Sequence, residues 1–212
     1  MEKIDYKKEF KELYLPKQTP VTVEVPPILF LMINGKGNPN DTEGEYGKAV
    51  ELLYALSYTI KMSKMGDFIP NGYFDYVVPP LEGLWWLENE ESFDFTRKDR
   101  FLWTSMIRQP EFVTQEVFAW ACSEVKRKKG LVAENVRLEP LTEGLCVQCM
   151  HIGPFDKEPE TTAKMEEYIS QNNLVNDLSP TRRHHEIYLV DPRKIAPEKN
   201  KVVLRVPVRN GI

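Results

Sequence analysis

The chain has 212 residues, a length that suits one large domain or two small ones. It carries 28 Lys and Arg against 32 Asp and Glu, a formal net charge of −4, and 42% of its residues are hydrophobic. This balance is typical of a folded globular protein and excludes disorder for the bulk of the chain. The slightly acidic charge, with no dense basic stripe, argues against nucleic-acid binding.

The N-terminus and the cysteines indicate the cellular compartment of the protein. No stretch approaches the roughly 20 apolar residues of a membrane helix, and the N-terminal segment is charged, unlike a signal peptide. Three cysteines, an odd number, fit a reducing compartment better than a disulfide framework. We therefore expect a cytoplasmic protein that binds no membrane.

The first elements follow from prolines and hydrophobic spacing. Residues 1–20 are charged and end in prolines, so we expect an N-terminal arm there. The apolar run 28–33 predicts a buried strand. Thr42 and Glu45 have the spacing of a capping box, and apolar residues then recur every three or four positions. This pattern predicts an amphipathic helix that ends near Met65.

Two more strands are expected at 73–78, which two prolines close, and at 84–88. Residues 98–107 are predicted to be helical, and a second amphipathic helix follows and ends at Gly130. These helices, at about 97–130, are predicted to be an insertion between two similar parts.

The second part repeats the order of the first. A strand at 144–153, a helix that begins near Pro159, and strands at 184–190 and 202–208 again give strand, helix, strand, strand. We interpret this repeat as an internal duplication. Two pairs of motifs correspond: Ile33-Asn34-Gly35 with His151-Ile152-Gly153, and Tyr76-Val77-Val78-Pro79-Pro80 with Tyr188-Leu189-Val190-Asp191-Pro192.

The duplication predicts an α+β fold with an N-terminal arm, 1–20, and a single domain, 21–212. Half-repeats at about 21–90 and 136–212 would pair around one core and leave a pseudo-twofold ligand cleft between them. The alternative is an ordinary α+β sheet whose halves are similar by coincidence.

Neither cysteines nor histidines have the spacing of a metal site. Cys146 and Cys149 match C-x-x-C, but within a predicted strand residues three apart point to opposite faces. His184 and His185 are on opposite faces for the same reason. We therefore expect no metal and no cofactor.

One strand carries a candidate site. Alternation puts His184, Glu186 and Tyr188 on one face and Ile187 and Leu189 on the other. If the first face is exposed to solvent, Glu186 is an ordinary surface charge. If the duplication holds, that face lines the cleft, and Glu186 and Tyr188 are candidate catalytic and ligand-binding residues.

Aromatic side chains are expected around Glu186. Two of them occupy the equivalent strand of the first half, one of two adjacent tryptophans faces inward, and one tryptophan comes from the inserted segment. These ligand-binding candidates are Phe74, Tyr76, Trp85, Trp86 and Trp103. Rings around one buried anion suit a planar, hydrophobic or cationic molecule, because the rings provide stacking area and the carboxylate attracts a cation. The alternative is that these rings only form core.

Three motifs carry a resemblance to a known family. They are Met150-His151-Ile152-Gly153-Pro154-Phe155, His185-Glu186-Ile187-Tyr188-Leu189-Val190-Asp191-Pro192, and Asp75-Tyr76-Val77-Val78-Pro79-Pro80-Leu81-Glu82-Gly83-Leu84-Trp85-Trp86. Together they resemble the GyrI-like small-molecule-binding family, over nearly the whole chain from about residue 20. The resemblance implies the duplicated module of the GyrI-like/SOUL type in a stand-alone member. It places the acidic ligand-contacting residue at Glu186, and His151 of the first motif joins the ligand-binding candidates.

The resemblance implies functions of two classes. The first is cytoplasmic binding and detoxification of hydrophobic planar or cationic molecules, and some stand-alone members are hydrolases that open the ring of cyclopropanoid alkylators. A glutamate that deprotonates water, with a Tyr or Trp that steadies the developing phenolate, would suit that reaction. The alternative is a ligand-responsive protein-interaction module, as in gyrase-inhibiting or regulatory relatives. Whether this chain is an enzyme stays open at this point.

Overall fold

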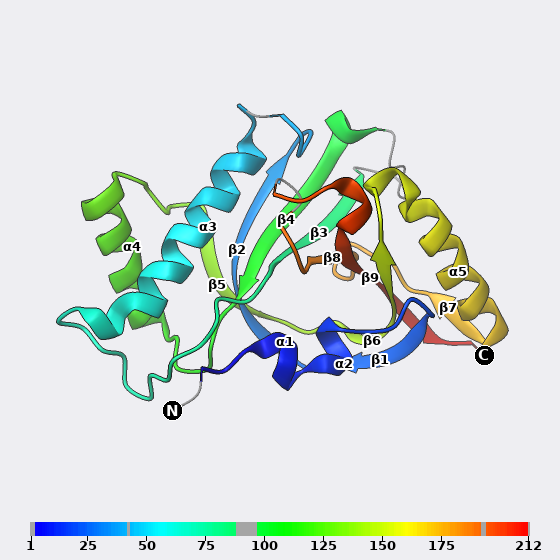
Figure 1. Cartoon of the computed structure of the whole chain (residues 1–212), viewed down its shortest axis with the longest axis horizontal. Coiled ribbons are helices and arrows are strands. Elements are labelled where there is room, and N and C mark those ends of the chain that lie inside the picture. Colours follow the sequence, from blue (N-terminus) through cyan, green and yellow to red (C-terminus); the bar gives the residue numbers. More distant parts are fainter. Residues whose placement is uncertain (1–2, 42, 88–96, 192–193, 212) are drawn as a thin grey trace.

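The computed structural model describes residues 3–41, 43–87, 97–191 and 194–211 (Figure 1). Within these residues, nine strands form one large sheet in which neighbouring strands are antiparallel. Helices pack on this sheet and on one another, which confirms the α+β fold class. No helix of the described part is long and apolar enough to cross a membrane.

The elements have the following bounds. The strands are β1 (Val21–Val25), β2 (Ile28–Lys36), β3 (Leu81–Leu87), β4 (Phe101–Arg108), β5 (Val136–Leu141), β6 (Gly144–Ile152), β7 (Leu174–Asn176), β8 (His184–Tyr188) and β9 (Lys201–Asn210). The α-helices are α1 (Tyr6–Glu9), α2 (Lys11–Tyr14), α3 (Glu45–Lys61), α4 (Gln115–Lys129) and α5 (Glu158–Gln171). Short 3₁₀ helices are found at Met62–Met65, Lys98–Arg100, Phe155–Lys157 and Pro197–Lys199.

The order of strands across the sheet is β1-β6-β9-β8-β3-β4-β2-β5, and β7 pairs with β9. The six inner strands are mirrored about the β8–β3 pair, with β6-β9-β8 on one side and β3-β4-β2 on the other. Helix α3 packs on β2 and β4, and α5 packs on β6, so the two helices flank the central strands (Figure 1).

Both helices cover the same face of the sheet. Directly paired residues of antiparallel strands share a face, and a row of such pairs runs from Cys149 under α5 to Ile33 under α3. This row passes through Glu186 and Gly83 at the centre. We call this side of the sheet the helix face.

Strand-helix-strand-strand order occurs twice, as β2-α3-β3-β4 and as β6-α5-β8-β9. The internal duplication itself stays a prediction. Its first half would end with β4, at Arg108, rather than near residue 90.

Residues 98–107 do not form the predicted helix. After a short 3₁₀ helix they form β4, which lies between β2 and β3 inside the sheet. Both faces of β4 are buried, so its sequence lacks the alternation that marks a half-exposed strand. The segment 97–130 therefore holds one α-helix, α4, which ends as predicted at Gly130, where φ is 70° and favours glycine.

Residues 73–78 do not form the predicted strand. Among the described residues, the only β-bridge of this segment is the one between Tyr76 and Ile4. Phe74 and Tyr76 instead pack their rings against Phe112, and the prolines that follow have no N–H to donate to a sheet. The correspondence of Phe74 and Tyr76 with Glu186 and Tyr188 is therefore wrong.

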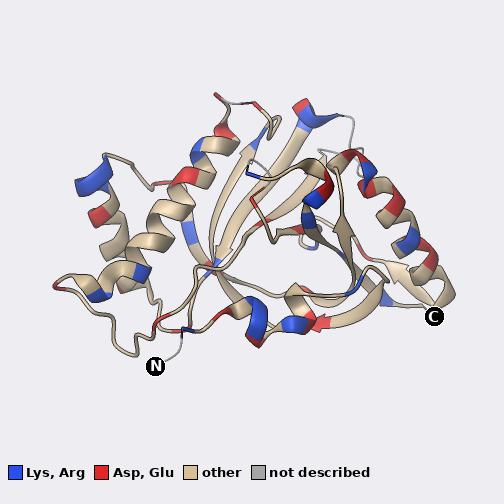
Figure 2. Ribbon diagram, viewed as in Figure 1, with Lys and Arg blue, Asp and Glu red and all other residues tan. Residues whose placement is uncertain are grey.

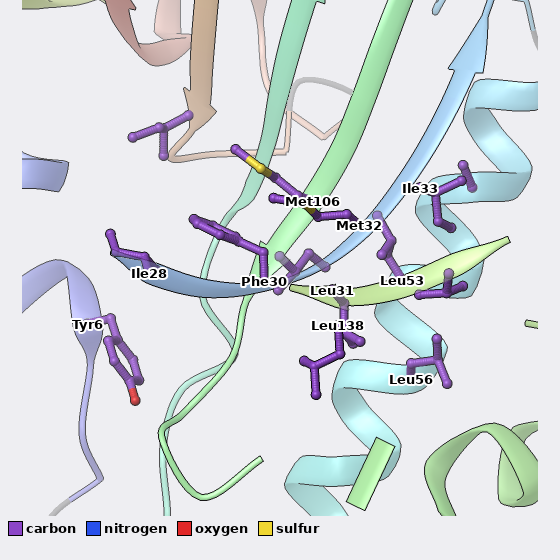
Figure 3. Close-up of a cluster of buried hydrophobic side chains, with 14 of the residues drawn as sticks. Tyr6, Ile28, Phe30, Leu31, Met32, Ile33, Leu53, Leu56, Met106 and Leu138 are labelled. Carbon is purple, nitrogen blue, oxygen red and sulfur yellow. The ribbon is translucent and has the colours of Figure 1, made fainter. Parts of the chain in front are cut away.

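The remaining predicted strands and helices are confirmed to within a few residues, as β2, α3, β3, β6, α5, β8 and β9. Strands β1, β5 and β7 were not predicted. Helix α3 begins after Gly44, which makes no side-chain cap, and Thr42 of the predicted capping box lies outside the described residues. Figure 3 shows the apolar side of this helix, where Leu53 and Leu56 point toward the sheet near Leu138 of β5.

The N-terminal arm is an integral part of the core. Helices α1 and α2 bury Tyr6, Leu13 and Tyr14 almost completely, and Figure 3 shows Tyr6 at one end of the hydrophobic cluster. The Tyr14 hydroxyl donates a hydrogen bond to Glu82 Oε1 (3.2 Å), and the Leu13 carbonyl accepts one from Arg205 (2.7 Å). The arm thus covers the face of the sheet opposite the helix face.

A buried ionic network lies on that opposite face. His185 Nε2 is 3.0 Å from Glu82 Oε2, and His185 Nδ1 is 2.9 Å from Glu143 Oε1. Arg205 lies 2.8 Å from the other oxygen of Glu143. Two carboxylates therefore meet two cationic partners, which is the condition under which buried charges are tolerated.

The network shifts the pKa values of its members in opposite directions. Burial alone would lower the pKa of His185, but Glu143 and Glu82 outweigh it and raise the pKa to about 9. Burial would raise the pKa of Glu143, but His185 and Arg205 lower it to about 2. The folded protein therefore binds a proton on His185 more tightly than the unfolded chain does.

These shifts predict a pH-dependent stability. The contribution of His185 is fully present below its unfolded pKa of 6.5 and is lost as the pH rises through about 9. We expect the free energy of unfolding to fall by about 2 to 3 kcal/mol over this window. Urea denaturation at several pH values measures it, and the His185→Gln variant should lack this slope. A wild-type stability that stays constant from pH 6.5 to 9 would contradict the assignment.

Candidate functional site

Glu186 lies at the centre of the helix face with its carboxylate held by two neighbours on its own strand. The Tyr188 hydroxyl donates a hydrogen bond to Oε2 (2.7 Å), and His184 Nε2 is 3.2 Å from Oε1. Alternation along β8 places the three side chains on one face, as the sequence predicts. Glu186 is only 6% exposed, so it is not an ordinary surface charge.

Trp85 is the tryptophan that faces Glu186. Its indole N–H donates a hydrogen bond to the Tyr188 hydroxyl (2.9 Å), so a chain of bonds runs from the indole through the phenol to the carboxylate. The register of β3 with β8 puts Gly83 opposite Glu186. A Cβ at Gly83 would lie 2.7 Å from the indole nitrogen, so the ring can lie across the strand only because this position is glycine.

Trp103 joins the cluster through an aromatic neighbour that the sequence did not reveal. The Tyr46 ring lies 5.5 Å from the Trp85 ring and 5.2 Å, edge-on, from the Trp103 ring. Trp103 lies over Gly35, where a Cβ would overlap its ring. We call Glu186, Tyr188, Trp85, Trp103 and Tyr46 the Glu186 cluster.

A second carboxylate, Glu158, lies close enough to feel the charge of Glu186. It occupies the first turn of α5 and is 2% exposed. Burial, and then the charge of Glu186, raise the pKa of Glu158 well above its ordinary value. Two neighbouring carboxyl groups in a site with little water hold one proton between them more easily than two charges, and the raised pKa of Glu158 favours its protonated form.

The phenols of the cluster stay protonated as well. Burial and the charge of Glu186 raise the pKa of Tyr188 and of Tyr46. Both hydroxyls are therefore hydrogen-bond donors at neutral pH. Two buried atoms, Trp103 Nε1 and Glu158 Oε1, have no hydrogen-bond partner among the described residues. These two atoms are free to form hydrogen bonds with a polar group of a ligand.

Three predicted site residues lie elsewhere. Trp86 is on the opposite face of β3, where Arg183 stacks 4.7 Å from its ring. Phe74 and Tyr76 are grouped with Phe112, as described above.

His151 shares the helix face but has structural partners. Its ring nitrogens lie 2.9 Å from Thr161 Oγ1 and 3.0 Å from the Pro154 carbonyl, so the imidazole ties the end of β6 to the first turns of α5. It thereby fixes the helix that carries Glu158.

The predicted cleft is filled by side chains in this structure. Trp85 is 4% and Trp103 1% exposed, and Phe101 and Phe155 pack beside Trp85 and Tyr188. A ligand therefore has to move aromatic side chains aside to reach Glu186.

Neither the cysteines nor other groups form a metal site in the part of the chain that the structure describes. No three His, Cys, Asp or Glu residues of that part are placed to hold an ion. Cys146 and Cys149 are free thiols that pack into two different core clusters. Burial raises the pKa of both thiols, which makes them poor nucleophiles.

Sequence reasoning missed Tyr46 and Glu158 because each lies in the first turn of a helix. Alternation along a strand identifies neighbours on that strand, whereas these two residues approach the strands only through the packing of α3 and α5. The available signal was the strand-loop-helix order in both halves, which directs the first turns of the two helices toward the centre.

Comparisons with known proteins identify a family whose model spans most of the chain, and solved structures that are similar to it. Residues 18–209 match a family model described as GyrI-like small molecule binding domain. An uncharacterized conserved protein from Listeria innocua, whose structure is solved, is 52% identical, with a TM-score of 0.92 over 98% of this chain and 100% of that chain. A hydrolase from Listeria innocua is 50% identical, with a TM-score of 0.89 and the same coverage.

More distant structures share the fold alone. The EcmrR C-terminal domain is 10% identical, with a TM-score of 0.53 over 91% of this chain and 98% of that chain. No curated protein matches the chain.

The hydrogen-bond chain predicts that removal of the Tyr188 hydroxyl lowers the stability of the fold. Tyr188→Phe leaves the Trp85 N–H and one oxygen of Glu186 without this partner, so we expect a loss of about 1 to 3 kcal/mol in unfolding free energy. Tyr168→Phe is the matched control, because its hydroxyl makes one neutral contact, with Thr22 (3.2 Å). Chemical denaturation measures both, and equal losses would contradict the special role of Tyr188.

Proposed function

This chain belongs to the GyrI-like small-molecule-binding family, and we propose that it binds planar hydrophobic or cationic aromatic molecules at the Glu186 cluster. The observation that carries the proposal is a buried carboxylate ringed by aromatic side chains, with no Lys or Arg ion pair to Glu186 among the described residues. A cationic ligand would supply the missing charge.

The rings determine the shape of the ligand. Trp85, Trp103 and Tyr46 offer faces and edges for stacking, and aromatic pairs gain about 0.5 to 1.5 kcal/mol beyond their buried area. A planar ligand that parts these rings replaces ring–ring contacts with ring–ligand contacts. A bulky aliphatic ligand would break the ring–ring contacts and make no stacking contacts in their place.

The charge of Glu186 predicts a selective loss of affinity. We expect Glu186→Gln to weaken binding of a rhodamine by about 1 to 3 kcal/mol, because the amide keeps the shape but loses the charge-assisted interaction. Fluorescence titration measures the dissociation constants. A neutral planar ligand should lose less.

Glu160→Gln is the matched control for this titration. It removes the same charge from an exposed position on α5, where Glu160 pairs with Lys157 at 3.1 Å. Equal dissociation constants for the cation in wild type and Glu186→Gln would refute the electrostatic role.

We further propose that the ligands include cyclopropanoid alkylators, which the protein hydrolyses. The resemblance to a family with such members supports this, as does the hydrolase of 50% identity. In the reaction a water oxygen bonds to the ring CH₂, a ring C–C bond breaks, and its electron pair moves into the conjugated dienone to give a phenolate. The water proton goes to the Glu186 carboxylate.

Glu158 supplies the proton that the phenolate needs. Glu158, whose pKa is raised, holds a proton that it can give to the phenolate oxygen, while hydroxyl or indole donors of the cluster stabilise the negative charge as it develops. The net change is the addition of one water. Proton exchange between the two carboxyl groups and solvent then restores the starting state.

Hydrolysis requires turnover, which binding alone does not. With an alkylator in excess, the wild type should form more than one equivalent of a ring-opened product that carries ¹⁸O from labelled water. Glu186→Gln should slow this by a factor of roughly 10² or more, Glu158→Gln should also slow it, and Glu160→Gln should not. If product formation stops at one equivalent, the protein only sequesters the compound.

A further inference from the structure

A groove of about 490 Å³ lies between α3 and α4, apart from the Glu186 cluster. One wall is the end of α3 with the following 3₁₀ helix and loop, and the other is α4. Its volume lies in the range of small-molecule sites, about 300 to 1,000 Å³. None of the residues of the Glu186 cluster lines it.

The floor of the groove is aromatic and its rim is apolar. Phe68 and Trp120 stack with ring centroids 4.6 Å apart and an interplanar angle of 26°. Met62 is 47% and Met65 75% exposed at the edge. Exposed apolar side chains that gather in one place mark binding surfaces, and thioethers adapt to ligands of different shape.

The charges of the lining favour an anion. Arg127 and Lys128 share Glu124, at 2.9 and 2.8 Å. Lys129 has no ion-pair partner in the described part of the chain, and Asp67 lies on the loop side of the groove. Three basic and two acidic residues thus line it, and Figure 2 shows basic residues, in blue, together at the end of α4.

A polar side chain in the lining is independent evidence for a ligand. Ser63 is 2% exposed, and its Oγ has no hydrogen-bond partner among the described residues. A buried hydroxyl without a partner loses the hydrogen bonds it would make in water. A ligand with an acceptor at this end of the groove would restore one.

We propose that this groove is a second binding site, which takes a small amphiphilic aromatic anion. The rings lie on Phe68 and Trp120, and the anionic group is directed to the basic end of α4. This site goes beyond the proposed function, and its charge preference is opposite to that of the Glu186 cluster.

The probe is 8-anilinonaphthalene-1-sulfonate, with N-phenyl-1-naphthylamine as its neutral counterpart. We expect Lys129→Glu to raise the dissociation constant of the sulfonate about fivefold, as expected for one exposed ion pair, and to leave the neutral probe unchanged. Lys126→Glu is the matched control, because it makes the same change on the same helix at a residue outside the groove lining. Equal effects of the two substitutions would overturn the proposal.

A second experiment fills the groove. Thr59→Trp places a ring between the walls, so we expect it to abolish binding of both probes while circular dichroism shows an intact fold. The Glu186→Gln variant should bind the sulfonate as the wild type does, and rhodamine should not displace it. Sulfonate binding that survives Thr59→Trp, or that rhodamine displaces, would overturn the second site and leave the Glu186 site unaffected.

Discussion

At the centre of the sheet, β8 pairs with β3 so that Glu186 lies opposite Gly83 and His184 opposite Trp85. This register puts the indole beside the phenol that holds the carboxylate. Because side chains alternate with a period of two, a slip of one residue would exchange Glu186 with His185. The carboxylate would then meet the ionic network under the N-terminal arm, and a histidine would face the aromatic rings. The site therefore depends on one register between two strands.

The two faces of the β8–β3 pair handle buried charge in opposite ways. Beneath the arm, Glu143 is neutralised by His185 and Arg205, so its charge has cationic partners within the protein. On the helix face, Glu186 has a tyrosine and a histidine as partners, and a second carboxyl group nearby. A carboxylate that is neutralised within the fold stabilises it, whereas an anion with few cationic partners is, in our proposal, the place for a ligand. Under that proposal, neighbouring residues of one strand serve stability and binding.

Alternation along a strand correctly predicted which of its side chains share a face. The alternation of β8 gave the common face of His184, Glu186 and Tyr188, and the C-x-x-C thiols were correctly placed on opposite faces. Strand β4 could not be predicted by alternation, because both of its faces are buried. Phe74 and Tyr76 were placed by assumed equivalence, which fails where prolines keep a segment out of the sheet. Tyr46 and Glu158 reach the site only through helix packing, which no short motif encodes.

Under the proposed function, the pair of carboxyl groups allows one site to serve two kinds of ligand. A cation is attracted by the charge of Glu186 and needs no proton. A neutral dienone needs a base for water and an acid for its oxygen, and the raised pKa of Glu158 keeps that acid available beside an acceptor. In this proposal, binding and hydrolysis use the same groups, and neither requires the proton of Glu158 to move before the ligand arrives. What separates the two outcomes is the ligand, since only a strained ring next to an electron-accepting carbonyl can use both carboxyl groups.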